Sequence, residues 1–273
     1  MAIADVNGVQ LFYEEVGAGP PTLVMHGGLG LDHTSYQSLD PLATCLRLVY
    51  YDHRGNGRSS RPDEAELTME AWADDGAALA RHIAGSDPVV VIGHSFGGFI
   101  AQEMAIRHGD AVRALILVAT TPGQLGAAET PAPEGPPMPD EFAELLRVMP
   151  ATDDEFAAGM ARLAPAYLHE APVERLTSLM AETVFSAMAM RRGFEELASW
   201  SAVDRLHAVD IPTLVIAGRH DAFTSWPQAD RIAAHMPHAE VVVFERSGHF
   251  PWIEEPDYFF DTITSWLRAH DIE

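Results

Sequence analysis

The sequence has no lysine among its 273 residues, and its basic side chains are therefore all arginines. Without a lysine amine, the chain cannot form a Schiff base with a carbonyl substrate or anchor pyridoxal phosphate. It also cannot build the nucleotide-binding loop in which a lysine contacts the β- and γ-phosphates. This single absence excludes several large classes of enzyme.

Cysteine is almost absent as well, since Cys45 is the only one. The chain therefore cannot form an intrachain disulfide, a zinc site made of several thiolates or an iron–sulfur centre. It shows no basic N-terminal region followed by an apolar block, and no apolar run approaches the roughly 20 residues that a membrane helix needs. We therefore expect a cytoplasmic protein.

Positive charge is scarce. The 17 basic residues are outnumbered by 40 acidic ones, which gives a formal net charge of −23 at pH 7. A chain of this charge repels the phosphates of nucleic acids and the surfaces of anionic membranes, so we expect no nucleic acid and no membrane as a partner. With 47% hydrophobic and 21% charged residues, the composition is that of a globular protein with a sizeable core. We expect a small molecule as its substrate.

One stretch, residues 89–100 with the sequence VVVIGHSFGGFI, has the pattern of a buried strand, a sharp turn and the start of a helix. Its centre is Gly93-x-Ser95-x-Gly97. Serine is a weak nucleophile unless such a turn projects its hydroxyl from the sheet, next to the positive N-terminus of a helix. The turn crowds the positions two before and two after the serine, where glycine removes the clash. The pattern predicts Ser95 as a nucleophile.

Strand and helix patterns alternate on both sides of this stretch. The dipeptide at residues 7–8, Asn-Gly, favours a two-residue turn and predicts an antiparallel hairpin in the first sixteen residues. Short apolar runs predict further strands at 22–25, 46–51, 89–92, 114–119, 213–218 and 241–244. Helical periodicity predicts helices between them at 69–83, 227–236 and 257–270. Alternating strands and helices form a parallel sheet covered on both faces. We expect an α/β fold with a mostly parallel, eight-stranded sheet.

The composition changes after residue 120. Residues 131–139, PAPEGPPMP, cannot be helix or central strand. The segment that follows, to about residue 204, is helical in pattern and contains no β-branched runs. We therefore expect an inserted helical cap at 121–204, between a first part of the α/β core at 1–120 and a second part at 205–273.

A serine nucleophile needs a base to accept its proton and a carboxylate to hold that base. In a parallel sheet, both should follow strands at the carboxyl edge. Asp221 and His249 each come shortly after a predicted strand. The order Ser95, Asp221, His249 is the one that accompanies this serine turn. We expect these three as the catalytic residues, with Asp210 as the next candidate for the acid.

Other candidate groups have simpler interpretations. His94, beside the serine, is expected to pack, and His220, beside the acid, to lie in a loop. No His-Glu-x-x-His pattern or other set of metal ligands occurs, so we expect no catalytic metal. Gly55-x-Gly57 lacks the third glycine of a dinucleotide-binding fingerprint. The sequence therefore predicts an enzyme without a cofactor.

Together, the serine turn, the early glycine cluster, the acid, the histidine and the position of the cap resemble the α/β-hydrolase superfamily over essentially the whole chain. The resemblance implies a fold of this type with a Ser-His-Asp triad. It also implies an oxyanion hole made by two backbone N–H groups, one from Phe96 after the nucleophile and one from Gly28 in the glycine cluster.

Within that superfamily, three motifs resemble the proline iminopeptidase group: HGGLG at 26–30, DHRGNGRS at 52–59 and SGHFPWIEEP at 247–256. The chain differs from that group at Leu29, where proline is usual. It also has Gly-His-Ser-Phe-Gly around Ser95, where the group usually has Gly-Gly-Ser-Trp-Gly.

The leading hypothesis is a serine hydrolase that cleaves a small carboxylic ester, lactone or amide through an acyl-enzyme. A proline iminopeptidase-type aminopeptidase is the alternative, and it needs carboxylates near the scissile bond to bind a free α-ammonium group. Glu195 and Glu196, beside Trp200 in the acidic cap, are candidate substrate-binding residues for this purpose. Cap methionines would instead suit irregular apolar acyl groups. A non-catalytic ligand receptor on the hydrolase fold, and a hydrolase of carbon–carbon bonds or a perhydrolase, stay open as further hypotheses.

Overall fold

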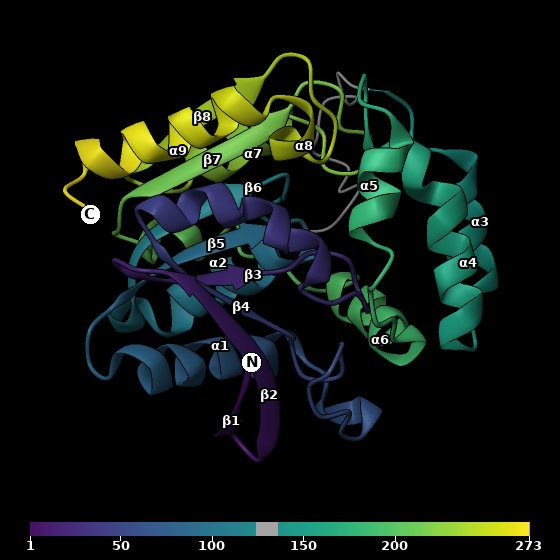
Figure 1. The fold of residues 1–273 in the computed structure, drawn as a ribbon, viewed down its shortest axis with the longest axis horizontal. Helices are drawn as coiled ribbons and strands as arrows, with labels where there is room; N and C mark the ends of the chain where they lie inside the picture. The colour runs from purple at the N-terminus through teal and green to yellow at the C-terminus, as the bar shows by residue number, and fades with distance from the viewer. Residues whose placement is uncertain (124–135, 273) are drawn as a thin grey trace.

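A computed structural model of the chain describes residues 1–123 and 136–272. Its centre is an eight-stranded sheet with the strand order β1-β2-β4-β3-β5-β6-β7-β8 (Figure 1). The strands are β1 (Ala2–Val6), β2 (Val9–Gly17), β3 (Pro21–Met25), β4 (Arg47–Tyr51), β5 (Val89–His94), β6 (Val112–Val118), β7 (Thr213–Gly218) and β8 (Ala239–Phe244). The pairs β1–β2 and β2–β4 are antiparallel, and the other five pairs are parallel. The predicted fold class is confirmed.

The hairpin between β1 and β2 turns at Asn7-Gly8, as the sequence predicts. Both residues have positive φ, 45° for Asn7 and 79° for Gly8. Positive φ at both central positions is the requirement of a tight hairpin turn, and asparagine and glycine meet it at the lowest cost. The turn places Val6 opposite Val9 and fixes the register of the two strands.

Helices cover both faces of the sheet, because successive residues of each central strand point to opposite sides. In β5, Val89 and Val91 pack in one hydrophobic cluster with α1 (Met69–Ala84), α2 (Phe96–Arg107) and α7 (Pro227–Ala233). Val90 and Ile92 pack in a second cluster with the 3-10 helix η1 (Thr34–Thr44), α8 (Pro251–Glu254) and α9 (Pro256–Ala269). Figure 1 shows α1 and α9 on opposite sides of the sheet.

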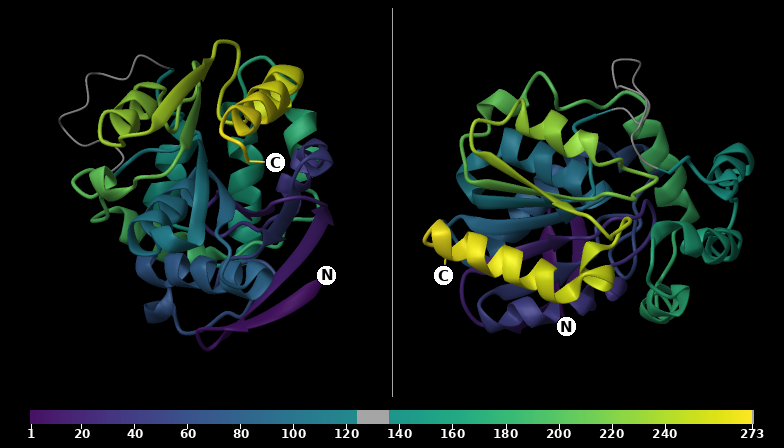
Figure 2. Two further views of the ribbon diagram at one scale, coloured as in Figure 1. Left: turned by 90° about the vertical axis from the view of Figure 1, so that its left-hand side faces the viewer. Right: turned by 90° about the horizontal axis from the view of Figure 1, so that it is seen from above.

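Among the described residues, four α-helices lie between β6 and β7 in the chain: α3 (Asp140–Val148), α4 (Asp153–Leu163), α5 (Val173–Leu179) and α6 (Ala187–Leu197). They gather at one end of the sheet, as Figure 1 and the right view of Figure 2 show. The predicted proline-rich segment 131–139 lies partly outside the described residues; its last four residues, 136–139, form neither helix nor strand. We refer to the described residues 136–200 as the cap, and the boundaries at 121 and 204 stay a prediction.

The helices of the described residues are of moderate length. The longest, α1, has 16 residues, and α9 has 14. Within residues 1–123 and 136–272, none is both long enough and apolar enough to cross a bilayer.

Candidate active site

Ser95 lies between the end of β5 and the first residue of α2. Its backbone has φ 51° and ψ −117°, a combination with positive φ that side-chain-bearing residues rarely adopt and that costs on the order of 1–3 kcal/mol. Two backbone hydrogen bonds hold the turn: the Ser95 N–H donates to the Val118 carbonyl at 2.9 Å, and the Gly98 N–H donates to the Ser95 carbonyl at 2.9 Å. The predicted sharp turn is therefore present, with Ser95 partly exposed at its tip.

The glycines around Ser95 allow this turn to fit against the sheet. A Cβ atom at Gly97 would lie 2.0 Å from the Met25 carbonyl oxygen of β3, which is a severe clash with backbone. A Cβ atom at Gly93 would lie 2.7 Å from the Ala101 Cβ. The two glycines are thus required by close packing of strand and helix, as the sequence pattern predicts.

His249 and Asp221 form a buried pair on the loops that follow β8 and β7. The Nδ1 atom of His249 lies 2.7 Å from Asp221 Oδ2, and both side chains are almost fully buried. Asp221 also accepts hydrogen bonds from the Thr224 hydroxyl at 2.6 Å and from the N–H groups of Phe223 and Thr224 at 2.8 and 3.1 Å. Burial alone would raise the pKa of Asp221, but His249 and these hydrogen bonds lower it to about 2.

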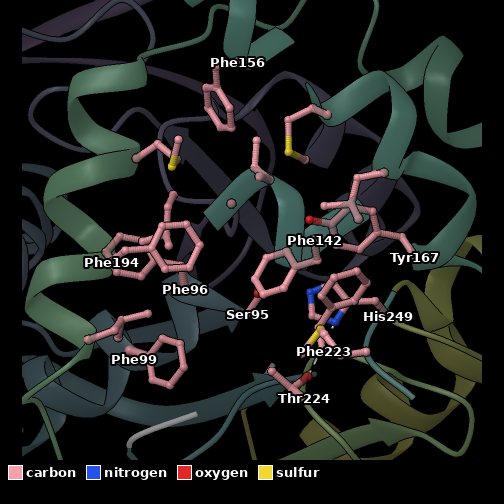
Figure 3. Close-up of a pocket in the computed structure, with 18 residues that line it drawn as sticks. Ser95, Phe96, Phe99, Phe142, Phe156, Tyr167, Phe194, Phe223, Thr224 and His249 are labelled. Carbon is pink, nitrogen blue, oxygen red and sulfur yellow. Dashed lines mark hydrogen bonds between the residues drawn. The ribbon is translucent and has the colours of Figure 1, made fainter. Parts of the chain in front are cut away.

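An ionised Asp221 fixes the tautomer of His249. A carboxylate only accepts hydrogen bonds, so the proton of the neutral imidazole is on Nδ1 and the lone pair is on Nε2. Ser95 and His249 both line one pocket, and Figure 3 shows their side chains within it. The arrangement can remove a proton from the serine hydroxyl if Nε2 is the acceptor.

Gly28 and Phe96 also line this pocket. Phe96 is the first residue of α2, and its N–H therefore has no acceptor within the helix. Gly28 has φ 68°, and its carbonyl accepts a hydrogen bond from the Leu31 N–H at 3.1 Å, which closes a tight loop after β3. The geometry places both predicted oxyanion-hole residues at the wall of the pocket that contains Ser95.

The rest of the pocket is apolar. Its polar lining groups are Ser95, His249, Thr224, the Gly28 backbone and Tyr167, which carries a hydroxyl. No arginine, aspartate or glutamate belongs to the lining that the structure describes. Aromatic, leucine and methionine side chains supply the remainder, many of them from the cap (Figure 3): Leu29, Phe96, Phe99, Met138, Phe142, Leu145, Phe156, Met160, Leu163, Met190, Phe194, Leu197 and Phe223. Such a pocket suits an uncharged, apolar ligand.

A family model described as "alpha/beta hydrolase fold" matches residues 20–256. The chain belongs to the α/β-hydrolase family. Proline iminopeptidase PfmaB from Pestalotiopsis fici is 29% identical over 97% of this chain and 98% of that protein. Two solved esterases have the same fold. The esterase from Exiguobacterium antarcticum is 21% identical, with a TM-score of 0.80, and the match covers 96% of this chain and 97% of that one. The thermophilic esterase from Thermogutta terrifontis is 26% identical, with a TM-score of 0.77, and the match covers 97% of this chain and 95% of that one.

These matches confirm the predicted resemblance to α/β hydrolases and, within them, to proline iminopeptidases. They also support the expectation that this α/β hydrolase is an enzyme, because the matched proteins are named as hydrolytic enzymes. In the part of this α/β hydrolase that the structure describes, no group of three or more histidine, cysteine, aspartate or glutamate side chains is arranged to hold a metal ion.

The structure does not bring Glu195, Glu196 and Trp200 into the pocket, which corrects our expectation for them. Both glutamates form ion pairs with Arg192 on the same helix, and Glu196 also accepts from the Met69 N–H at 3.0 Å. The Trp200 indole donates to a buried carboxylate of α2, Glu103, at 2.8 Å. The spacing of three and four residues from Arg192 is the sequence signal that would have predicted these helical ion pairs.

The alternative acid, Asp210, and the two histidines next to Ser95 and Asp221 in the sequence have other partners. Asp210 is exposed and pairs with His238 at 2.9 Å. His94 is buried and hydrogen-bonded on both ring nitrogens, as expected for a packing residue. His220 stacks on His169 of the cap, with ring centroids 3.5 Å apart.

Sequence reasoning missed three groups that support the site. Thr224 hydrogen-bonds Asp221, and the Asp-x-x-Thr spacing of these two residues is a signal that could have been used. Tyr167 belongs to the cap, and its carbonyl accepts a hydrogen bond from the His249 N–H at 2.8 Å. The third group is Tyr36, whose hydroxyl contacts the Gly27 N–H and His94 Nδ1. No local sequence pattern predicts these contacts, because His94 is far from Tyr36 in the sequence.

A carboxylate ties the histidine loop to the cap. Glu254 accepts hydrogen bonds from the Gly248 N–H at 2.5 Å and from the N–H groups of residues 169, 170 and 171 at 2.7, 2.9 and 3.3 Å. Because four donors from two segments meet on one side chain, the position of the cap is coupled to the position of His249.

Proposed function

We propose that this α/β hydrolase is a serine hydrolase that cleaves a neutral carboxylic ester or lactone with an apolar acyl group, without a cofactor. Ser95 is the nucleophile, His249 is the general base and then the general acid, and Asp221 orients and stabilises His249. The observation that carries the proposal is the buried hydrogen bond between Asp221 and His249 at the edge of an apolar pocket that also contains Ser95 on a strained turn.

In the first half of the reaction, the Ser95 oxygen forms a bond to the substrate carbonyl carbon while its proton moves to His249 Nε2. The carbonyl π electrons move to the carbonyl oxygen, which accepts hydrogen bonds from the N–H groups of Phe96 and Gly28. When this tetrahedral species collapses, the alcohol oxygen leaves with the proton from His249 and the acyl group stays on Ser95. Water then repeats the two steps and releases the acid.

Electrostatics favour this assignment. The low pKa of Asp221 keeps its carboxylate ionised at neutral pH, and a buried anion at hydrogen-bond distance stabilises the imidazolium that forms at His249. Each backbone donor to the oxyanion contributes about 3 kcal/mol in a site that excludes water. The apolar lining provides that exclusion.

The pocket does not favour a substrate with a free amine, although the curated relative named above is a proline iminopeptidase. A compact ammonium group that leaves water needs a carboxylate facing it, and an unpaired one costs several kcal/mol. The described lining contains no acidic side chain, and Glu195 and Glu196 are engaged by Arg192. The apolar lining therefore favours neutral esters and lactones over aminoacyl amides.

The proposal is tested by comparing p-nitrophenyl butyrate, an acyl lactone, proline β-naphthylamide and its N-acetylated form at equal concentration, with Ser95→Ala as the control. We expect the neutral substrates to be turned over best and the Ser95→Ala variant to be folded, inactive and unlabelled by a fluorophosphonate. Preference for the free amine, lost on acetylation, would support the aminopeptidase instead. A stoichiometric burst without further turnover would favour a receptor.

A further inference from the structure

A row of three hydrogen bonds joins the loops of the site. The Gly27 N–H donates to the Tyr36 hydroxyl at 2.6 Å, and the Tyr36 hydroxyl lies 2.7 Å from His94 Nδ1. On the other side of the ring, His94 Nε2 lies 2.8 Å from the carbonyl oxygen of His249. Tyr36 and His94 are 2% and 3% exposed, so water does not compete for these bonds.

The two ends of the row determine where each proton lies. A backbone carbonyl only accepts, so His94 Nε2 carries a proton and donates it to the His249 carbonyl. Gly27 donates to the Tyr36 oxygen, so the Tyr36 hydroxyl proton is free to be donated to His94 Nδ1. Burial lowers the pKa of His94 well below its usual value and raises the pKa of Tyr36, so both groups stay neutral. The row has a single direction, from Gly27 to the His249 carbonyl.

Three members of the row are linked through the backbone to groups of the proposed site. Gly27 precedes Gly28, His94 precedes Ser95, and the accepting carbonyl belongs to His249 itself. The packing leaves little room for adjustment, since a Cβ atom at Gly27 would lie 2.8 Å from both His94 Nδ1 and the Ser95 Cβ. The row therefore sets the distance between the glycine loop, the serine turn and the histidine loop, which lie far apart in the sequence.

We propose that Tyr36 and His94 are positioning residues, which hold the oxyanion-hole loop and the His249 backbone in register with Ser95. The inference rests on the proposed serine hydrolase function. Neither side chain lines the pocket, so neither touches the substrate. Their effect is on donors and a base that act on the transition state, and it is transmitted through Gly27 and the His249 carbonyl.

This role has a kinetic signature that mere support of the fold lacks. If the N–H of Gly28 or the imidazole of His249 shifts by a fraction of an ångström, transition-state stabilisation falls while the apolar contacts to the substrate remain. The value of kcat for each correctly folded site should therefore fall, with KM little changed. A residue that only supports the fold changes the number of active sites and leaves the rate of each one unchanged.

The main test is Tyr36→Phe, which removes one oxygen and leaves the Gly27 N–H and His94 Nδ1 without their partner. Tyr50→Phe is the matched control, because Tyr50 is equally buried and its hydroxyl donates to Asp40 at 2.9 Å, away from the pocket. Active sites are titrated with a fluorophosphonate, and the maximal rate with a p-nitrophenyl ester is divided by the titrated concentration to give kcat per site. We expect Tyr36→Phe to lose about 10- to 100-fold in kcat per site and Tyr50→Phe to lose none.

A second pair of variants tests His94. Glutamine has an amide oxygen that can accept and an N–H that can donate, whereas phenylalanine fills a similar volume without either. We expect kcat per site to fall in the order wild type, His94→Gln, His94→Phe. The inhibition constant of phenylboronic acid, which mimics the tetrahedral transition state, should rise by the same factor as kcat/KM falls in each variant that folds.

The outcomes separate the two proposals. If the wild-type chain takes up no fluorophosphonate, the proposed function is wrong and the positioning role is wrong with it. If the wild type is labelled and Tyr36→Phe keeps the rate per titrated site, losing only titratable sites or melting temperature as Tyr50→Phe does, the positioning role alone is refuted. A rise in KM at constant kcat would also refute it, because it would place Tyr36 in substrate binding.

Discussion

Replacing Asp221 by asparagine is the sharpest test of the site, because the change is nearly isosteric and removes one charge. The amide oxygen can still accept from the Phe223 and Thr224 N–H groups, as Oδ1 does now. The amide NH₂, however, would face His249 Nδ1 and donate to it. The imidazole would then carry its proton on Nε2, where it cannot accept one from Ser95.

The expected loss in kcat/KM is about 10³- to 10⁴-fold, which corresponds to about 4 to 5.5 kcal/mol of transition-state stabilisation. The assay is turnover of a p-nitrophenyl ester by wild type, Asp221→Asn and, as the control, Asp210→Asn. Asp210 is exposed and pairs only with His238 among its described ion-pair partners, so its variant should keep full activity. An Asp221→Asn variant within tenfold of wild type would refute the assignment of the acid, and a loss in Asp210→Asn would move the acid there.

The same substitution has a pH-dependent effect on stability. The pKa of Asp221 falls from 3.8 to about 2 on folding, and at about 1.4 kcal/mol for each pKa unit this contributes about 2 kcal/mol. Because the folded value is the lower one, the contribution is complete above about pH 4 and is lost as the pH falls towards 2. Urea unfolding should therefore show a gap between wild type and Asp221→Asn that narrows over this range. A gap of constant size would mean that the carboxylate charge does not stabilise the fold.

Three further substitutions have expected outcomes. Glu254→Ala removes the acceptor of four backbone N–H groups. It should lower the free energy of unfolding by about 2 kcal/mol and speed amide hydrogen exchange at residues 169–171. Unchanged exchange at these residues would contradict the coupling of the cap and the histidine loop. Asp75→Ala leaves the buried Arg54 without its bidentate carboxylate partner. The free energy of unfolding measured in urea should fall by about 3–5 kcal/mol, while kcat per titrated site stays constant. A loss below about 1 kcal/mol would show that water solvates Arg54 in the variant. Gly97→Ala should yield no folded protein by circular dichroism. The control Gly109→Ala, in which no atom lies within 4 Å of the added carbon, should fold normally. A folded, active Gly97→Ala variant would contradict the close packing of the serine turn.

Local sequence patterns were sufficient to predict the sheet and to select the three residues of the proposed triad. The Gly93-x-Ser95-x-Gly97 turn could be predicted because its backbone conformation depends on residues two positions away. Asp221 and His249 could be predicted because side chains that follow parallel strands meet at one edge of the sheet, where the structure brings them to 2.7 Å.

The composition of the pocket was decided by the tertiary structure. Helical periodicity shows that a cap helix has a polar and an apolar face, but it does not show which partner each face meets. The sequence offered Glu195 and Glu196 as candidate ammonium ligands for the aminopeptidase alternative, whereas the folded chain pairs them with Arg192 and lines the pocket with apolar side chains.

The row that joins Tyr36, His94 and His249 is likewise a product of the fold. Its members are separated by 58 and 155 residues, and a buried tyrosine or histidine has no sequence pattern that identifies its hydrogen-bond partner. The sequence by itself determined where the residues of the proposed triad lie relative to the strands, because strand ends and tight turns are local. Only the tertiary structure decided what surrounds them, because those contacts form between segments that meet when the sheet and the cap pack together.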